Sequence, residues 1–403
     1  MTIALRLASA LSALALSTCI LGSGAALAQQ AARTSSSPER PAGESSLPLP
    51  KGPQQSKMPL VSSDLFEEAA ELATGGRIRG KPGVSGASVG ANAESDAANL
   101  SEPEAFGSST APYTTARVAV GALGSSTTNA KTPVTSYPYR ATGKLWARWG
   151  DSWYVCTASL VKKGVLITAA HCIFNYGDRA EGWADEVRWY PANYAQNGAP
   201  YGYYSHRQLR VPTSYYAGTD TCTQAGVVCN NDIATVVLNT RDGQYPGNVV
   251  GWYAYGWNGY SFKKSSFLGN KTTVQITQLG YPLAFDSGYQ MIRTDAVGWY
   301  YSSGSLKNTQ IGSAQTGGSS GGPWLTNFGT KPSVSSAASL GNKTSQAVVG
   351  VTSYGSTTKG YNRQGASYFG QNKEFSGSDY GGYGAGNIGK IMQDTCAAQP
   401  SYC

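Results

Sequence analysis

Histidine is scarce in this chain, which has only two in 403 residues, His171 and His206. None of the cysteine pairs has the C-x-x-C spacing that is typical of structural zinc sites. We therefore expect no metal, and nothing in the sequence calls for another cofactor. Lys and Arg form no dense cluster, which disfavours nucleic-acid binding. No apolar run approaches the roughly 20 residues that a membrane-spanning helix needs.

The amino terminus has the composition of an export signal. Arg6 is the only early charge, residues 7–21 are mostly apolar, and Ala26-Leu27-Ala28 offers a small-x-small cleavage site. Residues 1–28 are therefore predicted to be a cleaved signal peptide, and the mature protein is expected to be secreted.

The cysteines indicate disulfides. Cys19 falls inside the predicted signal, and its alternative role as a lipid anchor is disfavoured because Thr18 precedes it. The other six form an even set, which in an exported chain indicates disulfide bonds. Many connectivities are open, and pairing of neighbours along the chain is the simplest of them. The favoured pairs are Cys156–Cys172, Cys222–Cys229 and Cys396–Cys403.

Composition changes near residue 117. Residues 29–117, called the leader below, have few aromatics and carry 8 Lys/Arg against 10 Asp/Glu, whereas residues 118–403 carry 22 against 13. So little apolar surface predicts a mostly disordered segment, with one short amphipathic helix over residues 64–72 that Asp64 can cap. We interpret the leader as a propeptide, with electrostatic docking on the basic domain or mere solubility as its alternative roles.

Short apolar or alternating runs, separated by Gly, Asn, Asp, Ser and Pro, dominate the chain after residue 118. This pattern is typical of an all-β fold with sheets or barrels, and no fixed-period repeat is present. A single short helix is expected near the carboxyl end, over residues 387–394. The predicted strands are Trp153–Val161, Val165–Ala170, Val187–Tyr190, Ile233–Asn239, Val249–Tyr255, Thr272–Leu279, Tyr289–Ala296 and Gln346–Tyr354.

Ser320 is the candidate nucleophile. It lies in the sequence Gly317-Gly318-Ser319-Ser320-Gly321-Gly322-Pro323, where glycines allow a tight turn that exposes a hydroxyl. The backbone N–H groups of Gly318 and Ser320 can converge there on a developing oxyanion. The segment also matches the G-x-S-x-G elbow of α/β-hydrolases, but that order requires a histidine after the serine, and none follows.

His171 and Asp232 are the candidate partners of Ser320. His171 follows the apolar run Leu166–Thr168, and Ala169 and Ala170 leave room around its ring. Asp232 begins the apolar run 233–238, which can bury its carboxylate against the imidazole. The chain order His, Asp, Ser is one of the known orders of a nucleophilic triad.

Two other residues compete for these roles. Asp151 precedes His171 and would give the order Asp, His, Ser, but Asp232 is preferred because the apolar run after it can bury its carboxylate against the histidine. His206 lies in a polar, aromatic stretch beside Arg207, which disfavours a second positive charge. We interpret His206 as an exposed surface histidine.

Five segments together resemble the chymotrypsin-like serine peptidases, most closely the bacterial branch that includes glutamyl endopeptidases. The resemblance covers roughly residues 118–395, and the two most specific motifs are TAAHC and GSSGGP. The segments are Cys156–Val161, Leu166–Cys172, Asn231–Ala234, Gly318–Pro323 and Ser353–Gly355.

The resemblance implies two packed antiparallel β-barrels with the triad in the cleft between them. The first barrel, residues 118–250, would hold His171 and Asp232, and the second, residues 251–403, would hold Ser320. It also implies an endopeptidase that hydrolyses polypeptides through an acyl-enzyme, and we expect the protein to be a monomer. Ser353-Tyr354-Gly355 is similar to the edge strand that pairs with the backbone of a peptide substrate.

The sequence departs from animal trypsins at the position before the nucleophile. The residue there is Ser319 rather than aspartate, so activation by an ion pair to a new amino terminus is excluded. Arg117 offers a cleavage point for release of the leader, and an ordinary linker cut anywhere nearby is the alternative.

Specificity is predicted from the residues that would line the pocket. Ala314 stands where trypsin has its aspartate, and Thr352 stands where glutamyl-specific relatives have a histidine. Gln315, Thr352 and Lys359 could meet a polar side chain, but we expect a neutral or small-to-medium apolar residue at P1. A preference for Lys or Arg would need a carboxylate from elsewhere, such as Asp379.

The many tyrosines support a second hypothesis. Amphipathic rings suit a glycan-binding or cell-envelope-binding surface on the same scaffold, without catalysis. The simpler interpretation is that the rings fill and cover β-barrels. A third alternative is an esterase with the same catalytic residues and a pocket closed to peptides. The aromatic segments are Tyr201–Tyr204, Tyr215–Tyr216 and Trp252–Trp257.

Overall fold

The computed structural model describes residues 33–43, 47–66, 111–118, 133–194, 198–265, 270–330, 344–358, 360–377, 380 and 384–403. All of them belong to one compact unit, Arg33–Cys403. The predicted signal peptide lies outside the described residues.

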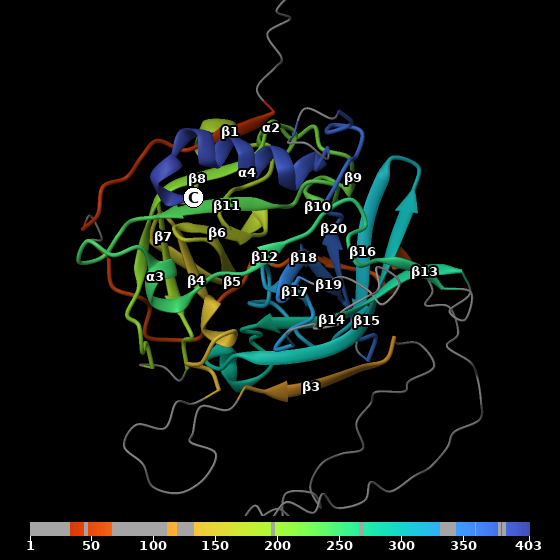
Figure 1. The fold of residues 1–403 in the computed structure, drawn as a ribbon, viewed down its shortest axis with the longest axis horizontal. Helices are drawn as coiled ribbons and strands as arrows, with labels where there is room; N and C mark the ends of the chain where they lie inside the picture. The colour runs from red at the N-terminus through yellow and green to blue at the C-terminus, as the bar shows by residue number, and fades with distance from the viewer. Residues whose placement is uncertain are drawn as a thin grey trace, which may run out of the picture. The chain divides into compact units, whose positions relative to one another are not determined.

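The first half of the body is a closed six-stranded antiparallel barrel (Figure 1). Its strands follow the ring order β7-β4-β5-β6-β11-β8, and pairing of β8 with β7 closes the ring. Buried, mostly apolar side chains in β5, β6 and β11 form its interior and explain why these runs become strands. The strands are β4 Thr142–Trp149, β5 Ser152–Lys162, β6 Val165–Thr168, β7 Glu186–Pro191, β8 Tyr204–Pro212 and β11 Ala234–Leu238.

The second half is one large sheet, with the path β12-β18-β17-β14-β15-β16-β20-β19-β2. The strands β13 and β3 join it at β14 and β15. Its members are β12 Ala254–Tyr255, β13 Lys263–Ser265, β14 Lys271–Gly280, β15 Ile292–Ser303, β16 Leu306–Gly312, β17 Pro323–Thr326, β18 Ala347–Val351, β19 Tyr354–Ser356 and β20 Arg363–Ser367, with β2 Leu60–Val61 and β3 Tyr113–Arg117 from the leader.

Helices are few and short among the described residues. The longest, α4 (Gly386–Ala398), lies across β8 and β11 (Figure 1) and confirms the predicted carboxyl-terminal helix. The others are α2 (Thr213–Tyr216), α3 (Pro246–Val250) and the 3-10 turns Ser63–Leu65, Tyr139–Ala141, Ala170–Cys172, Arg179–Gly182, Asp286–Gly288 and Pro400–Tyr402. The predicted all-β class is therefore confirmed.

One apolar cluster joins the barrel to the sheet. It combines Val161 and Ile167 of the barrel with Leu279 and Val351 of the sheet, and Ile388 of α4 packs into it. All five side chains are almost completely buried. Burial of this kind is the main stabilising force between packed layers, so the seam between the two halves is a fixed surface on which a site can be built.

The three disulfides pair neighbours along the chain, as the spacing favoured: Cys156–Cys172, Cys222–Cys229 and Cys396–Cys403. The first links β5 to the turn after β6, and the second staples the hairpin of β9 (Cys222–Gln224) and β10 (Val227–Cys229). The third ties the end of α4 to the carboxyl terminus.

One predicted strand is wrong. Residues 249–255 do not form a single strand, because Pro246 starts α3, and Gly251, at φ 75°, ends it. Only Ala254 and Tyr255 then extend, as β12. Proline at the first turn and a positive-φ glycine after the last are the usual helix start and stop residues.

Three pieces of the leader are ordered against the body. β1 (Thr34–Ser36) pairs antiparallel with β8, β2 pairs parallel with β19, and β3 pairs antiparallel with β15. The predicted helix over residues 64–72 is described only to Phe66, where Ser63–Leu65 forms a 3-10 turn without a side-chain cap. The rest of that prediction lies outside the described residues.

Candidate active site

His171 lies in the 3-10 turn Ala170–Cys172 that directly follows β6. The disulfide from Cys172 to Cys156 ties this turn to β5. The side chain of His171 is buried, with 6% of the residue exposed. A short rigid connection to two barrel strands therefore holds the imidazole at the seam between the halves.

Asp232 lies just before β11 and is oriented by three hydrogen bonds. His171 Nδ1 donates to Oδ2 at 2.8 Å, and His171 N donates to Oδ1 at 2.9 Å. Ser353 Oγ donates to Oδ2 at 2.5 Å from the opposite half of the molecule. Since the carboxylate accepts from Nδ1, the proton resides on Nδ1, and Nε2 is left as the basic nitrogen.

Ser320 lies in the loop between β16 and β17. Thr157 N donates to Ser320 O at 2.7 Å, and Gly321 N donates to Thr352 O at 2.7 Å, so both halves hold this loop. The hydroxyl is buried and has no hydrogen-bond partner among the described residues. The Nε2 of His171 has Cys172 Sγ 3.9 Å away. Ser320 Oγ and His171 Nε2 thus both lack a strong hydrogen-bond partner among the described residues.

Two glycines beside Ser320 are required by the backbone. Gly318 has φ 96°, and a Cβ there would lie 2.4 Å from Tyr281 O. Gly321 has φ 75°, and a Cβ there would lie 1.9 Å from Thr168 Oγ1. Only glycine fits such close approaches at positive φ, which explains the glycines in the motif.

The backbone N–H of Gly318, which the sequence predicts as an oxyanion donor, already has a hydrogen-bond partner. This N–H donates to Ser56 Oγ of the leader at 2.9 Å, while the Gly318 carbonyl accepts from Thr157 Oγ1 at 2.9 Å. Both peptide groups that flank the Gly318 Cα therefore have hydrogen-bond partners outside the loop. A polar oxygen therefore already lies where this donor would bind a substrate.

The predicted pocket residues are mostly engaged with the protein itself. The Gln315 amide donates to Thr294 Oγ1 at 3.1 Å, and Thr352 Oγ1 accepts from Gln278 Nε2 at 2.7 Å and from Trp324 Nε1 at 3.0 Å. Of the edge residues Ser353, Tyr354 and Gly355, the first bonds to Asp232. Ala314 is partly buried beside the second-half core, and Lys359 and Asp379 lie outside the described residues.

Gln364, on β20, is a site residue that sequence reasoning missed. Its Nε2 lies 2.6 Å from Gln315 O, 3.0 Å from Ser319 Oγ and 3.9 Å from Met58 Sδ. The residue is completely buried, and its side chain forms a polar, uncharged wall beside the loop that carries Ser320. No local motif surrounds it, so only tertiary contacts identify it.

The two competing residues are placed elsewhere. Asp151 is exposed in the turn between β4 and β5. The prediction of an exposed His206 is wrong, because β8 turns it inward and leaves it 3% exposed. Its Nδ1 accepts from Val187 N at 2.9 Å. Burial, aided by Arg40, lowers the pKa of His206 to about 4, so the ring is neutral.

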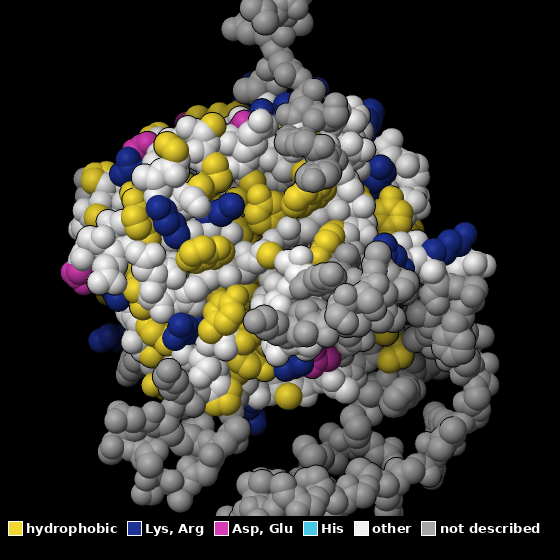
Figure 2. Space-filling model, in the orientation of Figure 1, with side chains coloured by type: hydrophobic (Ala, Val, Ile, Leu, Met, Phe, Trp, Pro, Cys, Tyr) yellow, Lys and Arg dark blue, Asp and Glu magenta, His cyan; other side chains and the backbone are white. Residues whose placement is uncertain are grey.

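Aromatic rings mostly fill the interior rather than forming a binding face. Tyr204, Tyr215 and Tyr253 are buried, while Tyr203 and Trp252 are exposed. On the face seen in Figure 2, Lys and Arg side chains are scattered among apolar and uncharged ones. This supports the interpretation that the tyrosines fill and cover the β framework.

Two groups of potential metal ligands lie together among the described residues. They are Cys156, His171 and Cys172, and Asp220, Cys222 and Cys229. In both groups the two sulfurs form a disulfide and cannot act as thiolate ligands. Neither donor set fits a metal ion.

Similarity to known proteins was found at three levels. A family model described as Trypsin matches residues 128–370. A protein of Bacillus subtilis (strain 168) named "Extracellular metalloprotease" is 34% identical over 125 residues, which are 30% of this chain and 34% of that protein. The chain thus matches about a third of the length of this relative.

Among solved structures, the protease Anisep from Arthrobacter nicotinovorans is similar, with 24% identity and a TM-score of 0.42. That match covers 58% of this chain and 92% of that one. A Glu endopeptidase in complex with MPD is 18% identical, with a TM-score of 0.41, over 66% of this chain and 94% of that one.

Proposed function

Because the chain belongs to the trypsin family of serine proteases, we propose that it is a secreted endopeptidase whose nucleophile is Ser320. The proposal assigns His171 as general base and acid, and Asp232 as the group that orients it. Gly318 and Ser320 are proposed as the oxyanion donors. No cofactor takes part.

In the proposed reaction, Ser320 Oγ attacks the carbonyl carbon of the scissile peptide while its proton passes to His171 Nε2. The negative carbonyl oxygen is stabilised by the backbone N–H groups, and Asp232 stabilises the imidazolium. The C–N bond then breaks, and His171 returns the proton to the leaving amine. Water, deprotonated by His171, hydrolyses the ester and frees Ser320.

The observation that supports this proposal best is the buried hydrogen bond between His171 Nδ1 and Asp232 Oδ2 at 2.8 Å. A carboxylate that also accepts from His171 N and Ser353 Oγ has its orientation fixed on both sides. A protein that only binds a ligand has no need of an imidazole prepared in this way.

Secretion is proposed from the composition of residues 1–28, and the name of the Bacillus subtilis relative describes that protein as extracellular. In the part of the chain that the structure describes, no helix has the length and hydropathy to cross a bilayer.

Cleavage after Arg117 remains a prediction. Arg117 ends β3, and Val118 N donates to Met291 O at 2.9 Å. The Arg117 side chain is paired with Asp286 at 2.6 Å. A protease needs an extended chain released from its neighbours, so a cut at this bond requires β3 to leave β15.

The proposal is tested by labelling the purified protein with a fluorophosphonate probe, before and after limited proteolysis of the leader. We expect labelling that Ser320→Ala abolishes and that Ser302→Ala, which removes an exposed hydroxyl on β15, leaves unchanged. A peptide-library digest of the labelled form then reports the P1 residue, for which we expect a neutral side chain.

Absence of labelling in every form would overturn the proposal and favour a non-catalytic binding protein. Labelling with turnover of small esters but not of peptides would instead indicate an esterase.

A further inference from the structure

One stretch of the leader crosses the proposed catalytic site. After β1, the red-to-orange trace of residues 33–66 follows the barrel before it reaches the second sheet (Figure 1). Its stretch from Gln54 to Phe66, called the cleft segment below, contacts both halves of the body. It belongs to the part of the chain for which composition predicts little order, so its ordered contacts need an explanation.

The cleft segment pairs with backbone on both sides of the nucleophile loop. On the barrel side, Val155 N donates to Gln55 O at 2.7 Å. On the sheet side, Gly355 N donates to Pro59 O at 3.0 Å, and Thr357 N donates to Val61 O at 2.8 Å. The bond from Gly355 N uses the edge strand that the family resemblance assigns to substrate binding, so a peptide substrate and the cleft segment compete for this backbone N–H.

Between these two anchors, the segment occupies the proposed oxyanion donor. Ser56 Oγ accepts from Gly318 N at 2.9 Å, and a Cβ on Gly317 would lie 3.0 Å from the same oxygen. The oxygen bound there is a side-chain hydroxyl rather than a peptide carbonyl. The cleft segment therefore occupies the donor with a side-chain oxygen, and its β2 strand runs parallel to β19.

Met58 fills the space beside Gln364. It is 7% exposed, its Sδ lies 3.9 Å from Gln364 Nε2, and a Cβ on Gly355 would lie 2.6 Å from its Cε. Since Gly355 has no side chain, it leaves room for this methyl group. The space accepts an unbranched, uncharged side chain of methionine's size, with a polar amide at its wall.

Side chains of the cleft segment are anchored on both halves. Lys57 Nζ donates to Asn175 Oδ1 at 2.7 Å and lies 3.5 Å from the centre of the Trp149 ring, on the barrel. On the sheet, Phe66 packs against Tyr354 and Tyr361, with ring centroids 5.5 and 5.6 Å apart. Burial of such rings contributes several times the energy of a single exposed ion pair.

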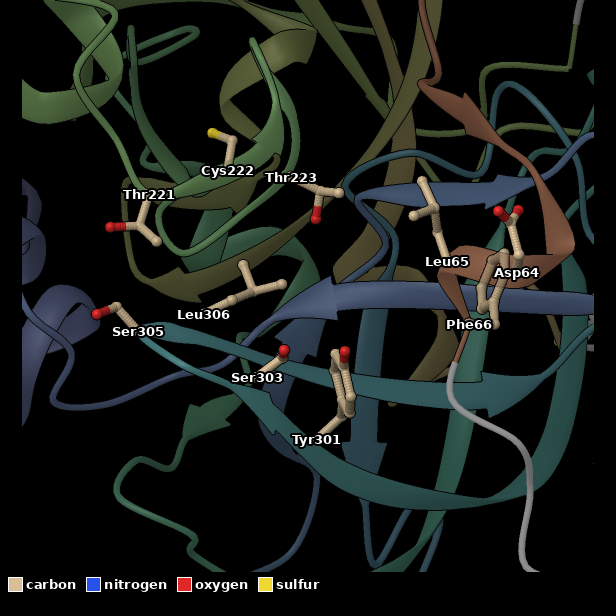
Figure 3. Close-up of a pocket in the computed structure, with 10 residues that line it drawn as sticks. All are labelled: Asp64, Leu65, Phe66, Thr221, Cys222, Thr223, Tyr301, Ser303, Ser305 and Leu306. Atoms are coloured by element: carbon tan, nitrogen blue, oxygen red, sulfur yellow. The ribbon is translucent and has the colours of Figure 1, made fainter.

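The end of the cleft segment also forms one wall of a pocket of about 550 Å³. Figure 3 shows Asp64, Leu65 and Phe66 on one side, facing Thr223 of β9 and Tyr301 of β15. The end of the cleft segment therefore supplies three of the ten residues that line this pocket.

We propose that residues 54–66 are an intramolecular inhibitor of the proposed peptidase, with Ser56 on the oxyanion donor and Met58 in the primary specificity pocket. The inference rests on the proposed function. It adds that activity appears when this segment leaves the cleft, and that the pocket prefers an unbranched, uncharged P1 side chain such as methionine.

The test compares two full-length variants of the leader. Met58→Asp places a carboxylate in the uncharged pocket, whereas Lys51→Asp changes an exposed side chain that precedes the cleft segment. We expect Met58→Asp to raise the rate of fluorophosphonate labelling, and of cleavage of a methionyl peptide amide, by at least tenfold over the unaltered chain. Lys51→Asp is expected to change either rate less than twofold.

A synthetic peptide of residues 54–66 supplies the second arm. Added to the Met58→Asp protein, it is expected to inhibit competitively, and the same peptide with Met58→Asp is expected not to. A fluorescent form of the peptide, titrated into full-length Met58→Asp/Ser320→Ala protein, measures docking without any need for catalysis. Thermal unfolding of both variants checks that they fold.

The outcomes separate the two proposals. Equal and rapid labelling of all forms, with no effect of the peptide, would overturn the inhibitor and leave the peptidase standing. No labelling of any form, while the fluorescent peptide still binds, would overturn the peptidase and with it the inhibitory role. Tenfold activation reversed by the peptide supports both.

Discussion

At the scale of single residues, one carboxylate connects the groups of the proposed site. Asp232 is 1% exposed and accepts from His171 Nδ1, His171 N and Ser353 Oγ. All three partners are donors, so a group that is only an acceptor matches the position. Any change that introduces a donor there must break one of these bonds or reverse the tautomer of the imidazole.

Asp232→Asn is therefore expected to lower kcat by roughly 10,000-fold with little change in KM, as in a studied triad of this kind. Its amide faces the Nδ1 side of His171 and favours the tautomer with the proton on Nε2, which cannot accept from Ser320. Ser353→Ala keeps the carboxylate and is expected to cost only about 10- to 100-fold. Steady-state kinetics after removal of the leader decide this, and equal losses in the two variants would contradict the assignment.

At the scale of elements, the closure of the barrel depends on a neutral histidine. The β7–β8 ladder pairs Arg188 with Ser205 and Trp189 with Tyr204, and beyond it Val187 N donates to the His206 ring. Protonation of His206 removes this acceptor and leaves a buried cation close to Arg40. The pairing of β7 with β8 is consequently sensitive to acid.

The pKa of His206 is lowered from 6.5 to about 4 in the folded state, chiefly by burial. Its contribution to stability is complete above pH 6.5 and is lost as the pH falls toward 4, because the unfolded chain takes up the proton first. The loss is on the order of 3 kcal/mol. Urea unfolding of Ser320→Ala protein at pH 7, 5.5 and 4 measures it.

His206→Gln serves as the comparison for that prediction. The variant is expected to be less stable at pH 7 but to lose less stability than its parent between pH 6.5 and 4. Parallel pH profiles of the two proteins would show that His206 does not control the acid sensitivity.

Whether the sequence predicts a strand depends on how that strand is buried. β5, β6 and β11 are mostly apolar and almost entirely buried, and the sequence predicts all three. β8, with the sequence YSHRQLRVP, was not predicted, because its polar side chains are satisfied by the leader. Gln208 Nε2 donates to Ser37 O at 3.4 Å, and Arg210 donates to Thr34 Oγ1 at 3.1 Å.

At the site, too, residues in recognisable local motifs can be predicted, whereas residues defined by distant contacts cannot. His171, Asp232 and Ser320 lie in short motifs whose chemistry can be recognised locally, and their roles stay proposals until tested. Ser56, Met58 and Gln364 have no such context, since their partners are far away in the sequence. A segment with the composition of the leader gives no local sign that one of its hydroxyls meets a backbone N–H in the site.

At the scale of the whole molecule, the leader is built into the body. β1 extends the barrel at β8, the cleft segment crosses the site, and Arg40 lies 3.8 Å from the buried Glu186. The leader carries 8 Lys/Arg against 10 Asp/Glu and the rest of the mature chain a net positive charge, which suggested electrostatic docking. The contacts combine strand pairing and buried apolar side chains with three ion pairs, Arg40–Glu186, Glu39–Arg207 and Arg117–Asp286. Salt screens strand pairing and apolar burial far less than it screens the exposed ion pairs.

A single cut between residues 67 and 110 is therefore expected to leave the leader bound. An inserted site for an unrelated protease, in Ser320→Ala protein, allows the cut without self-digestion. We expect both fragments to elute together in size-exclusion chromatography at low salt and also at about 1 M salt, where the Debye length is only about 3 Å. Cut protein that also carries Met58→Asp should lose the leader fragment more readily, because the cleft contact is weakened. Separation of the fragments at high salt alone would show that charge, rather than strand pairing and burial, holds the leader in place.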